Sequence, residues 1–365
     1  MPGLELCRRF YEEAVRPVLD SHFPGLPHAA ALIGHGSDVL GFDDEISMDH
    51  DWGPRLQLFL TEEDVAEDPD LAASICAGLA THLPGRFAGF PVGWADAGDD
   101  GVRVMAGARD VGGPVRHRVS VQTLRAFVVE LLGFDTSEEP DACDWLTFPS
   151  QILRSLTGGA VYYDGNGELA LLRRRLGWYP RDVWIYLLAA GWQRIGQEEH
   201  LMPRAGMMGD ELGSALIGSR LVRDVMSLCF LMERQYAPYP KWFGTAFRGL
   251  ACASDLEPVL WRAQQAARWE EREEALCTAY EVLAGMHNRL GMTEPLGTAV
   301  ATFFDRPFRV IGGEARARAL AERIGDPDLR RLAGERLIGG LDQLTDNTDL
   351  RVDMSRRTAL RGLYG

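Results

Sequence analysis

Hydrophobic positions follow two different periods along this chain, and the change of period divides it into two parts. In the first part, short apolar runs separated by turns predict strands at 29–33, 55–60, 102–105 and 118–121. Helical spacing predicts helices at 4–20, at 37–40 after a Gly-Ser turn, from an Asp-Pro-Asp cap to residue 81, and at 124–132. We therefore expect a small mixed sheet with helices over residues 1–150.

The second part has the 3.6-residue period of helices. This period covers residues 180–197, 212–234, 256–290 and 314–324, with proline and glycine between the segments. One exception is a hairpin expected at 160–169, turning on Asp164-Gly165-Asn166-Gly167. The chain is therefore expected to be an α+β protein, with an all-helical domain over residues 151–365.

The composition is that of a globular protein with enough hydrophobic residues to form two cores. The chain has 365 residues, of which 46% are hydrophobic, and a domain takes roughly 150 residues. No apolar run reaches the ~20 residues of a membrane span, and charged residues interrupt the N-terminus where a signal peptide would be apolar. Six scattered cysteines without a Cys-x-x-Cys pair indicate reduced thiols and no zinc site. We expect a cytoplasmic protein that does not enter a membrane.

The charge balance restricts the class of partner. The net charge is −15, and the densest basic run is Arg173-Arg174-Arg175. A general nucleic-acid binder needs a basic face, because contacts to phosphate supply most of its affinity. The sequence therefore argues against general nucleic-acid binding and favours a small-molecule partner.

Two carboxylates and a Gly-Ser turn carry the strongest chemical signal. Asp49 and Asp51 flank a histidine, and on a strand both would point to one face. Their charges repel unless a cation lies between them, and hard oxygen ligands favour Mg²⁺. Gly36-Ser37, upstream by an eleven-residue spacer, offers backbone N–H groups and a hydroxyl that suit phosphate. Together they predict a site for a metal-bound nucleoside triphosphate.

Gly36-Ser37, the spacer and Asp49-x-Asp51 resemble the signature of the DNA polymerase β nucleotidyltransferase superfamily, which includes antibiotic and other small-molecule adenylyltransferases. Most of the chain is similar to bacterial proteins grouped as domain of unknown function 4037 (DUF4037), where segments 197–199, 209–214 and 239–244 have counterparts. The first likeness implies a nucleotidyltransferase-like N-terminal domain. The likeness to DUF4037 proteins implies no particular activity.

The superfamily resemblance implies roles for single residues. Asp49 and Asp51 would hold two metal ions that bind the triphosphate, and Gly36 and Ser37 would contact its phosphates. The implied reaction moves a nucleoside monophosphate, which we expect to be AMP from ATP, to a hydroxyl or similar group of a small molecule with release of pyrophosphate. A third carboxylate on a later strand usually completes the site. Here the alternation of 118–121 presents Ser120, which cannot act as a general base.

The missing base is expected from the helical domain, which would bind the substrate or the nucleotide. Glu198 and Glu199 follow an apolar helix and are the candidates for the catalytic base. Arg204 belongs to a dense group of polar residues that suggests a lined cleft, and we expect it to contact the nucleotide. Lys241, set among aromatic residues, is expected to contact the nucleotide phosphates across the domain interface.

Each prediction has a plainer competitor. Asp49 and Asp51 could be surface charges, and Ser37 could be a helix N-cap. Glu198 and Glu199 could form ion pairs at a helix end, and Lys241 could be an exposed surface lysine. The rival functions are a catalytically inactive nucleotide-binding or scaffold protein, which the missing third carboxylate favours, and a protein adenylyltransferase. The sequence leaves open the acceptor, the preferred base and the oligomeric state.

Overall fold

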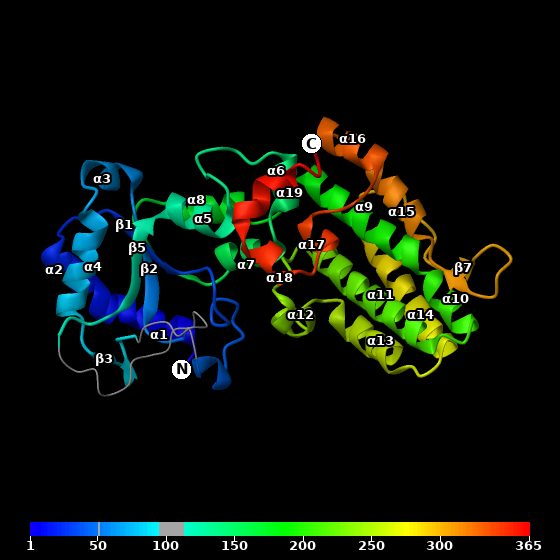
Figure 1. The fold of residues 1–365 in the computed structure, drawn as a ribbon, viewed down its shortest axis with the longest axis horizontal. Helices are drawn as coiled ribbons and strands as arrows, with labels where there is room; N and C mark the ends of the chain where they lie inside the picture. The colour runs from blue at the N-terminus through cyan, green and yellow to red at the C-terminus, as the bar shows by residue number, and fades with distance from the viewer. Residues whose placement is uncertain (50–51, 95–112) are drawn as a thin grey trace. The chain divides into compact units, whose positions relative to one another are not determined.

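A computed structural model describes residues 1–49, 52–94 and 113–365, and the chain divides into two compact units (Figure 1). Unit 1 consists of Met1–Glu139 and Ile152–Gly177, and unit 2 of Pro140–Gln151 and Trp178–Gly365. The single boundary predicted after residue 150 differs from this division. The chain passes between the units three times, because segment 152–177 carries a strand that belongs to the sheet of unit 1.

Unit 1 is built on a four-stranded sheet with the strand order β5-β2-β1-β6. The strands are β1 (His28–Leu32), β2 (Arg55–Leu60), β5 (Arg118–Thr123) and β6 (Ala160–Asp164). β1 is antiparallel to both β2 and β6, whereas β2 is parallel to β5. The mixed sheet expected from the sequence is therefore confirmed.

Helices from the N-terminal part cover one face of this sheet. They are α1 (Gly3–Phe10), a π-helical turn (Tyr11–Val15), α2 (Arg16–His22) and α4 (Leu71–His82), with the short α3 (Glu62–Glu67) before α4. Phe10 and Leu79 belong to the same buried cluster as Leu56, Leu58 and Leu60 of β2. The alternation in β2 places those leucines on the core face, and the helices predicted at 4–20 and up to residue 81 are confirmed.

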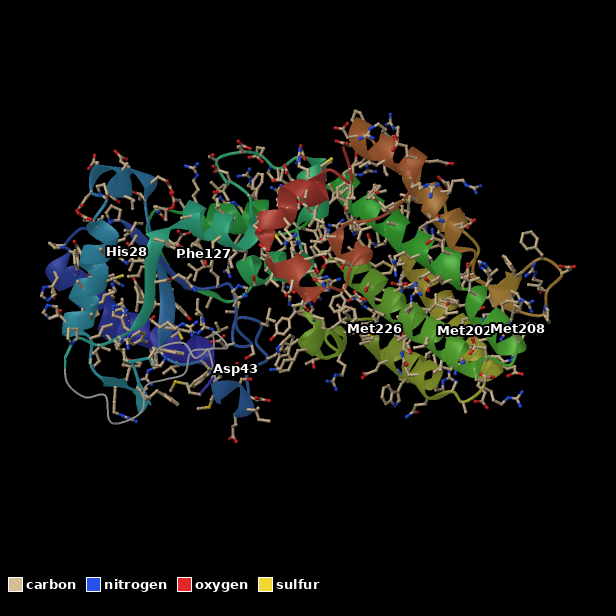
Figure 2. All side chains as sticks on the ribbon, viewed as in Figure 1. His28, Asp43, Phe127, Met202, Met208 and Met226 are labelled. Carbon is tan, nitrogen blue, oxygen red and sulfur yellow. The ribbon has the colours of Figure 1, made fainter. Side chains whose placement is uncertain are left out.

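Helix α5 (Leu124–Leu132) packs against the other face. It begins at Thr123, whose hydroxyl accepts a hydrogen bond from the Ala126 N–H at 3.1 Å. Phe127, which is labelled in Figure 2, meets Phe59 edge to face, and the ring centroids are 5.3 Å apart. A Cβ at Gly34 would lie 3.0 Å from the Phe127 ring, so glycine allows the turn after β1 to pass close to α5. The helix predicted at 124–132 is confirmed with the same bounds.

The hairpin predicted at 160–169 is wrong. β6 ends at Asp164 and pairs with β1, not with a following strand. Gly167 takes up a left-handed conformation, with φ +75°, and α8 (Glu168–Arg175) starts directly after it. The Asp164 carboxylate accepts hydrogen bonds from the Leu169 and Ala170 N–H groups at 3.3 and 2.9 Å. The residues that suggested a tight turn therefore begin a helix.

Unit 2 is mainly helical, and the helices α9 (Arg181–Glu198), α11 (Glu211–Met232), α14 (Trp269–Arg289) and α15 (Gly313–Ala321) form its framework (Figure 1). The helix expected as one element at 256–290 is two helices, α13 (Ala253–Gln265) and α14. The chain reverses at Ala266, whose backbone is extended. The Arg272 guanidinium donates to the Ala266 carbonyl at 2.7 Å, which satisfies an acceptor at the end of α13.

Shorter elements complete both units. They are α6 (Ala142–Thr147), α7 (Ser150–Thr157), α10 (Leu201–Met207), α12 (Pro240–Phe247), α16 (Pro327–Glu335), α17 (Leu341–Leu344), α18 (Thr348–Val352), the 3-10 turn Met354–Arg356 and α19 (Arg357–Arg361). Two small hairpins join β3 (Arg86–Phe87) to β4 (Phe90–Pro91), and β7 (Ala301–Thr302) to β8 (Arg309–Val310). The α+β class is confirmed, with β7–β8 as an addition to the expected helical domain.

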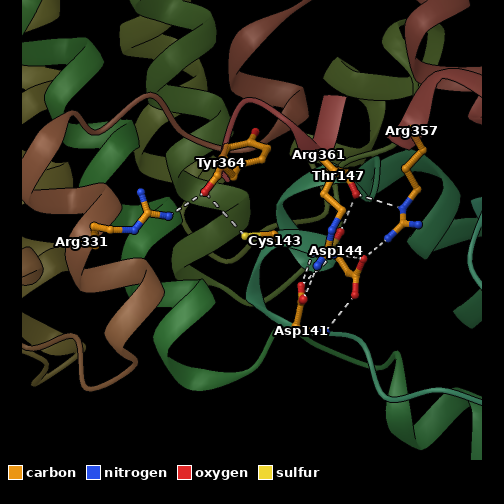
Figure 3. A network of polar contacts seen from close by, with 8 residues as sticks. All are labelled: Asp141, Cys143, Asp144, Thr147, Arg331, Arg357, Arg361 and Tyr364. Atoms are coloured by element: carbon orange, nitrogen blue, oxygen red, sulfur yellow. Dashed lines mark hydrogen bonds and ion pairs between the residues drawn. The ribbon is translucent and has the colours of Figure 1, made fainter. Parts of the chain in front are cut away.

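The C-terminal segment is tied to α6 by a polar network (Figure 3). Asp144 accepts hydrogen bonds from the guanidinium groups of Arg357 and Arg361. The Arg357 Nε donates to the Thr147 hydroxyl at 3.0 Å, and Tyr364 is 1% exposed. Asp144 also closes a capping box with Asp141 at the start of α6. The last residues of the chain are therefore a structural part of unit 2.

Two further predictions can be compared with the described residues. All six cysteines are free thiols. Across the described ranges 1–49, 52–94 and 113–365, no helix has the length and apolar character needed to cross a membrane. The strand expected at 102–105 lies outside the described residues.

Candidate functional site

The turn that follows β1 contains the predicted phosphate-binding residues. Gly36 has φ +134°, a conformation that favours glycine, and a Cβ there would collide with Asp38 and Arg55. The helix predicted at 37–40 is wrong: the segment is a pair of turns, with the Phe42 N–H bonded to the Ser37 carbonyl at 2.9 Å. Within the described residues, the N–H groups of Gly36 and Ser37 and the Ser37 hydroxyl donate to no other group.

A buried ion pair joins this turn to the first residue of β2. The Arg55 Nη2 donates to Asp38 Oδ1 at 2.7 Å and to the His35 carbonyl at 3.3 Å. Asp38 is 1% exposed, and burial raises the pKa of its carboxyl while the charge of Arg55 lowers it. Asp38 Oδ2 is buried and has no partner among the described residues. The pair therefore holds the turn against the edge of the sheet at which β2 begins.

The side chain of Gln57 adds a second connection at the same place. Its Oε1 accepts from the Ile33 N–H and its Nε2 donates to the Ile33 carbonyl, both at 3.1 Å. Ile33 directly follows β1, so both backbone polar groups at the end of that strand are satisfied. β1, the turn and β2 are thus joined by side chains as well as by the strand ladder.

The acidic residues before Asp49 are engaged by donors of the chain. Asp43 Oδ2 accepts from the Gly3 N–H at 2.7 Å and from the Trp52 indole N–H at 3.1 Å (Asp43 is labelled in Figure 2). Asp44 Oδ1 accepts from the N–H groups of Ile46 and Ser47 at 3.0 and 2.9 Å. These contacts fix the path of the loop that leads to Asp49, and they occupy both carboxylates.

The prediction that Asp49 lies on a strand is wrong. Asp49 ends a 3-10 turn, Ile46–Asp49, which the Asp44 side chain initiates, and β2 begins only at Arg55. Gly53, with φ +138°, and Pro54 separate the two elements. The side chain of Asp49 and the whole of Asp51 lie outside the described residues. Their role as metal ligands stays a prediction.

The third position of the expected site is on β5, beside β2. Ser120 is paired with Gln57 in the parallel register. Val119 belongs to the buried cluster whereas Ser120 is exposed, so the alternation is as predicted. β5 carries no carboxylate along its length. The structure therefore supplies no acid on β5 in place of this serine.

A magnesium ion is implied by the resemblance, and the donor chemistry at the turn fits it in part. Carboxylate oxygens at Asp49 and Asp51 are the ligands that Mg²⁺ prefers. Apart from those two residues, the described chain contains no group of three or more His, Cys, Asp or Glu side chains that could hold a metal ion. Asp38, Asp43 and Asp44 are already engaged by cations or N–H groups, so the two predicted aspartates would have to provide the protein ligands.

The two predicted glutamates lie in unit 2 and differ in their contacts. Glu199 is 4% exposed, and its carboxylate accepts from the Ile311 and Gly313 N–H groups at 2.5 and 3.0 Å. Burial raises its pKa to about 7. Glu198 pairs with Arg220 through Oε1, while its Oε2 is buried and has no partner among the described residues. Glu199 therefore caps the start of α15, and Glu198 has one buried oxygen without a partner among the described residues.

The two predicted cations of unit 2 are exposed. Lys241 stands in the first turn of α12, and its Nζ lies 4.9 Å from the centroid of the Trp242 ring. Arg204 is on α10. Both residues belong to unit 2, whereas the Gly-Ser turn belongs to unit 1, and their contact with a nucleotide stays a prediction.

The Asp38–Arg55 pair was not identified from the sequence. Two signals point to it in retrospect: Asp38 directly follows Gly36-Ser37, and Arg55 begins a strand that is otherwise apolar except for Gln57. A charged residue at the start of a buried strand needs a partner, and an acid in the turn can supply it.

Comparison with known proteins supports the DUF4037 likeness over part of the chain. Residues 145–243 match the family described as domain of unknown function (DUF4037), which confirms the predicted resemblance for that segment. No curated protein matches the chain. A crystal structure of a nucleotidyltransferase-like protein from Exiguobacterium sibiricum is similar at 10% identity and a TM-score of 0.33, covering 76% of this chain and 75% of that chain. A TM-score this low does not establish a shared fold, so no function is transferred from it.

Proposed function

We propose that this protein is a Mg²⁺-dependent nucleotidyltransferase that moves a nucleoside monophosphate, AMP from ATP, to a hydroxyl or similar group of a small molecule. Pyrophosphate would be the second product. The nucleotide site would be the turn after β1 together with Asp49 and Asp51.

The observation that carries this proposal is the state of the Gly36-Ser37 turn. Its N–H groups and the Ser37 hydroxyl donate to nothing else in the described chain, while its conformation is fixed by the buried pair of Asp38 and Arg55. Backbone N–H groups that are both unpaired and rigidly held form a natural phosphate site. The carboxylates of Asp43 and Asp44 hold the loop that leads from this turn to Asp49.

Each group of the chain has a separate part in the proposed reaction. The N–H groups of Gly36 and Ser37 would donate hydrogen bonds to phosphate oxygens and orient the triphosphate. Asp49 and Asp51 would hold Mg²⁺, which when bound neutralises charge on the phosphates and on the leaving pyrophosphate. Asp38 and Arg55 act indirectly, as positioning residues for the turn.

The acceptor hydroxyl needs a base, and Ser120 is not one. Of the two glutamates predicted for this role, Glu198 fits better because its Oε2 has no partner among the described residues, whereas both oxygens of Glu199 accept backbone N–H groups. We therefore propose Glu198 as the base, and Lys241 and Arg204 as nucleotide contacts.

A second candidate function is a nucleotide-binding protein without turnover. The serine at position 120, opposite Gln57, favours it, because the expected third carboxylate is not on β5. The two candidates share the nucleotide site and differ only in catalysis.

Release of pyrophosphate separates them. The purified protein is incubated with ATP, Mg²⁺ and a pool of small metabolites that carry hydroxyl groups, next to an Asp49→Asn variant and an Asp20→Asn control on the exposed face of α2. The proposal predicts Mg²⁺-dependent pyrophosphate release by the wild type and the control, and a loss of ~10²-fold or more in Asp49→Asn. Nucleotide binding with no release for any acceptor would support the second candidate instead.

A further inference from the structure

Unit 2 contains an apolar cavity whose lining includes no residue of the turn after β1. Its volume is about 440 Å³, within the range of small-molecule sites. All of the residues that line it belong to unit 2, so it does not depend on how the two units are placed. The nucleotidyltransferase proposal makes no use of this cavity.

Aromatic side chains form much of the wall. Six rings line the cavity: Trp145, Phe148, Tyr179, Phe230, Tyr236 and Phe243. Several of them meet at steep angles, as in the Tyr179–Tyr236 pair, where the centroids are 5.0 Å apart and the planes are inclined by 83°. Steeply inclined rings offer both faces and edges, which are the surfaces that another planar ring packs against best.

The charged groups at the cavity are already paired with one another. Arg223 pairs with Asp346, and Arg351 lies 3.5 Å from Asp346 and 3.6 Å from Asp342. Two arginines and two aspartates leave no net charge. An ionised ligand group would have to displace one of these pairs or lie unpaired among aromatic rings, and both are costly.

Ser227 and Gln235 offer uncharged polar groups to a ligand. Ser227 on α11 and Gln235 after it line the cavity, and the side chains of both have no hydrogen-bond partner within the described part of the chain. Ser227 also lines a second, polar recess of about 250 Å³ that shares Arg223, Asp342 and Asp346 with the first. A ligand that fills the aromatic part could therefore bond a hydroxyl or amide group to these side chains.

We infer that this cavity is a binding site for an uncharged planar aromatic molecule that carries a hydroxyl or amide group. The rings of the wall would bury the planar part, and Ser227 or Gln235 would bond the polar group. The inference is independent of nucleotidyl transfer, since it rests on residues of unit 2 alone.

Binding of three probes by calorimetry at neutral pH tests this inference. 2-Naphthol has an uncharged planar ring with one hydroxyl, 2-naphthoate has the same ring with a charged group, and cyclohexanol has the hydroxyl without the planar ring. We expect 2-naphthol to bind at least ~10-fold more tightly than either of the others.

Two variants locate the binding. Ser227→Phe fills the cavity and should weaken 2-naphthol binding at least ~10-fold. Ser219→Phe, on the same helix, is the matched control: Ser219 is exposed and not part of the cavity, and binding should be unchanged. If Ser227→Phe does not fold, Phe243→Ala removes one ring of the wall and should weaken binding several-fold. The inference is overturned if 2-naphthol does not bind, if cyclohexanol binds as tightly, or if both cavity variants bind like the wild type.

Discussion

The Arg55 Nη2 lies 2.7 Å from Asp38 Oδ1, and the two side chains are 7% and 1% exposed. This pair connects the turn after β1 to the first residue of β2, and Gly36 lies so close to it that a Cβ would collide with both side chains. The turn that carries the proposed phosphate contacts is therefore built around a buried charge pair. The arrangement predicts that stability and nucleotide binding depend on the same residues.

Replacing Asp38 with asparagine should destabilise the protein strongly. The variant leaves the Arg55 guanidinium buried without a counter-charge, which costs about 3 kcal/mol. Glu13→Gln is the matched control, because it breaks the exposed Arg9–Glu13 pair, and it should leave the free energy of unfolding almost unchanged. Urea unfolding measures both free energies. Equal losses in the two variants would show that the Asp38–Arg55 pair does not hold the turn.

Gly36→Ala should affect both stability and nucleotide binding. The new side chain meets Asp38 and Arg55 in a conformation with φ +134°, so we expect a loss of at least ~3 kcal/mol and loss of ATP binding. Gly41→Ala is the control, because Gly41 also has a positive φ, +73°, but has open space around its Cβ position. It should lose only about 1 kcal/mol and keep its affinity for ATP. A Gly36→Ala protein with normal binding would exclude a phosphate role for this turn.

The pH dependence of stability should report the burial of Glu199. Burial raises the pKa of this carboxyl from 4.5 to about 7 in the folded protein. Between these values the folded chain keeps a proton that the unfolded chain has released. The stability contributed by the protonated form is therefore complete below pH 4.5 and is lost as the pH rises through 7, by about 3 kcal/mol in total.

The comparison of two variants isolates this effect from other titrating groups. Glu199→Gln cannot titrate, so its stability relative to the wild type should rise across pH 4.5–7. Gln197→Ala, at an exposed neighbouring position that carries no titrating group, should keep the wild-type slope. Unfolding free energies at a series of pH values measure both, and identical slopes for wild type and Glu199→Gln would contradict the account.

The sequence predicted the regular elements better than the connections between them. Periodicity located β2, α5 and α9, because each buries one side of a regular element. It failed at Asp164-Gly165-Asn166-Gly167, since the same turn residues can close a hairpin or begin a helix. The pairing of β6 with β1 decides between a hairpin and a helix here, and β1 lies over a hundred residues earlier in the chain. The local sequence around a turn does not identify a strand partner that is so distant in the chain.

The candidate site shows the same limit. The spacing of Gly36-Ser37 and Asp49-x-Asp51 indicated the proposed nucleotide chemistry, but not the 3-10 turn that holds Asp49 or the buried pair behind the turn. Those features depend on the side chains of Asp44 and Arg55, whose partners are decided by the fold. For Glu199, the sequence indicated a buried helix end but not the backbone N–H groups of Ile311 and Gly313 that it caps.

The C-terminal network should contribute to the stability of unit 2. Arg357→Met removes a buried donor from Asp144 and Thr147, and because Arg361 still pairs with Asp144 we expect a moderate loss of about 2 kcal/mol. Arg356→Met, at the neighbouring exposed position, should change stability by less than about 0.5 kcal/mol. Thermal unfolding monitored by circular dichroism distinguishes the two. Equal melting temperatures would show that the network adds nothing.

The central claim is that the Gly36-Ser37 turn, Asp49 and Asp51 form a metal-dependent nucleotide site. The most direct measurement is calorimetric titration of a non-hydrolysable ATP analogue into the wild type, Asp49→Asn and Asp51→Asn, each with Mg²⁺ and with EDTA, and with Asp20→Asn as control. We predict binding that requires Mg²⁺ in the wild type and control, and an affinity at least ~10-fold lower in both site variants. Binding that is the same with and without Mg²⁺, or unchanged by both substitutions, would contradict the account.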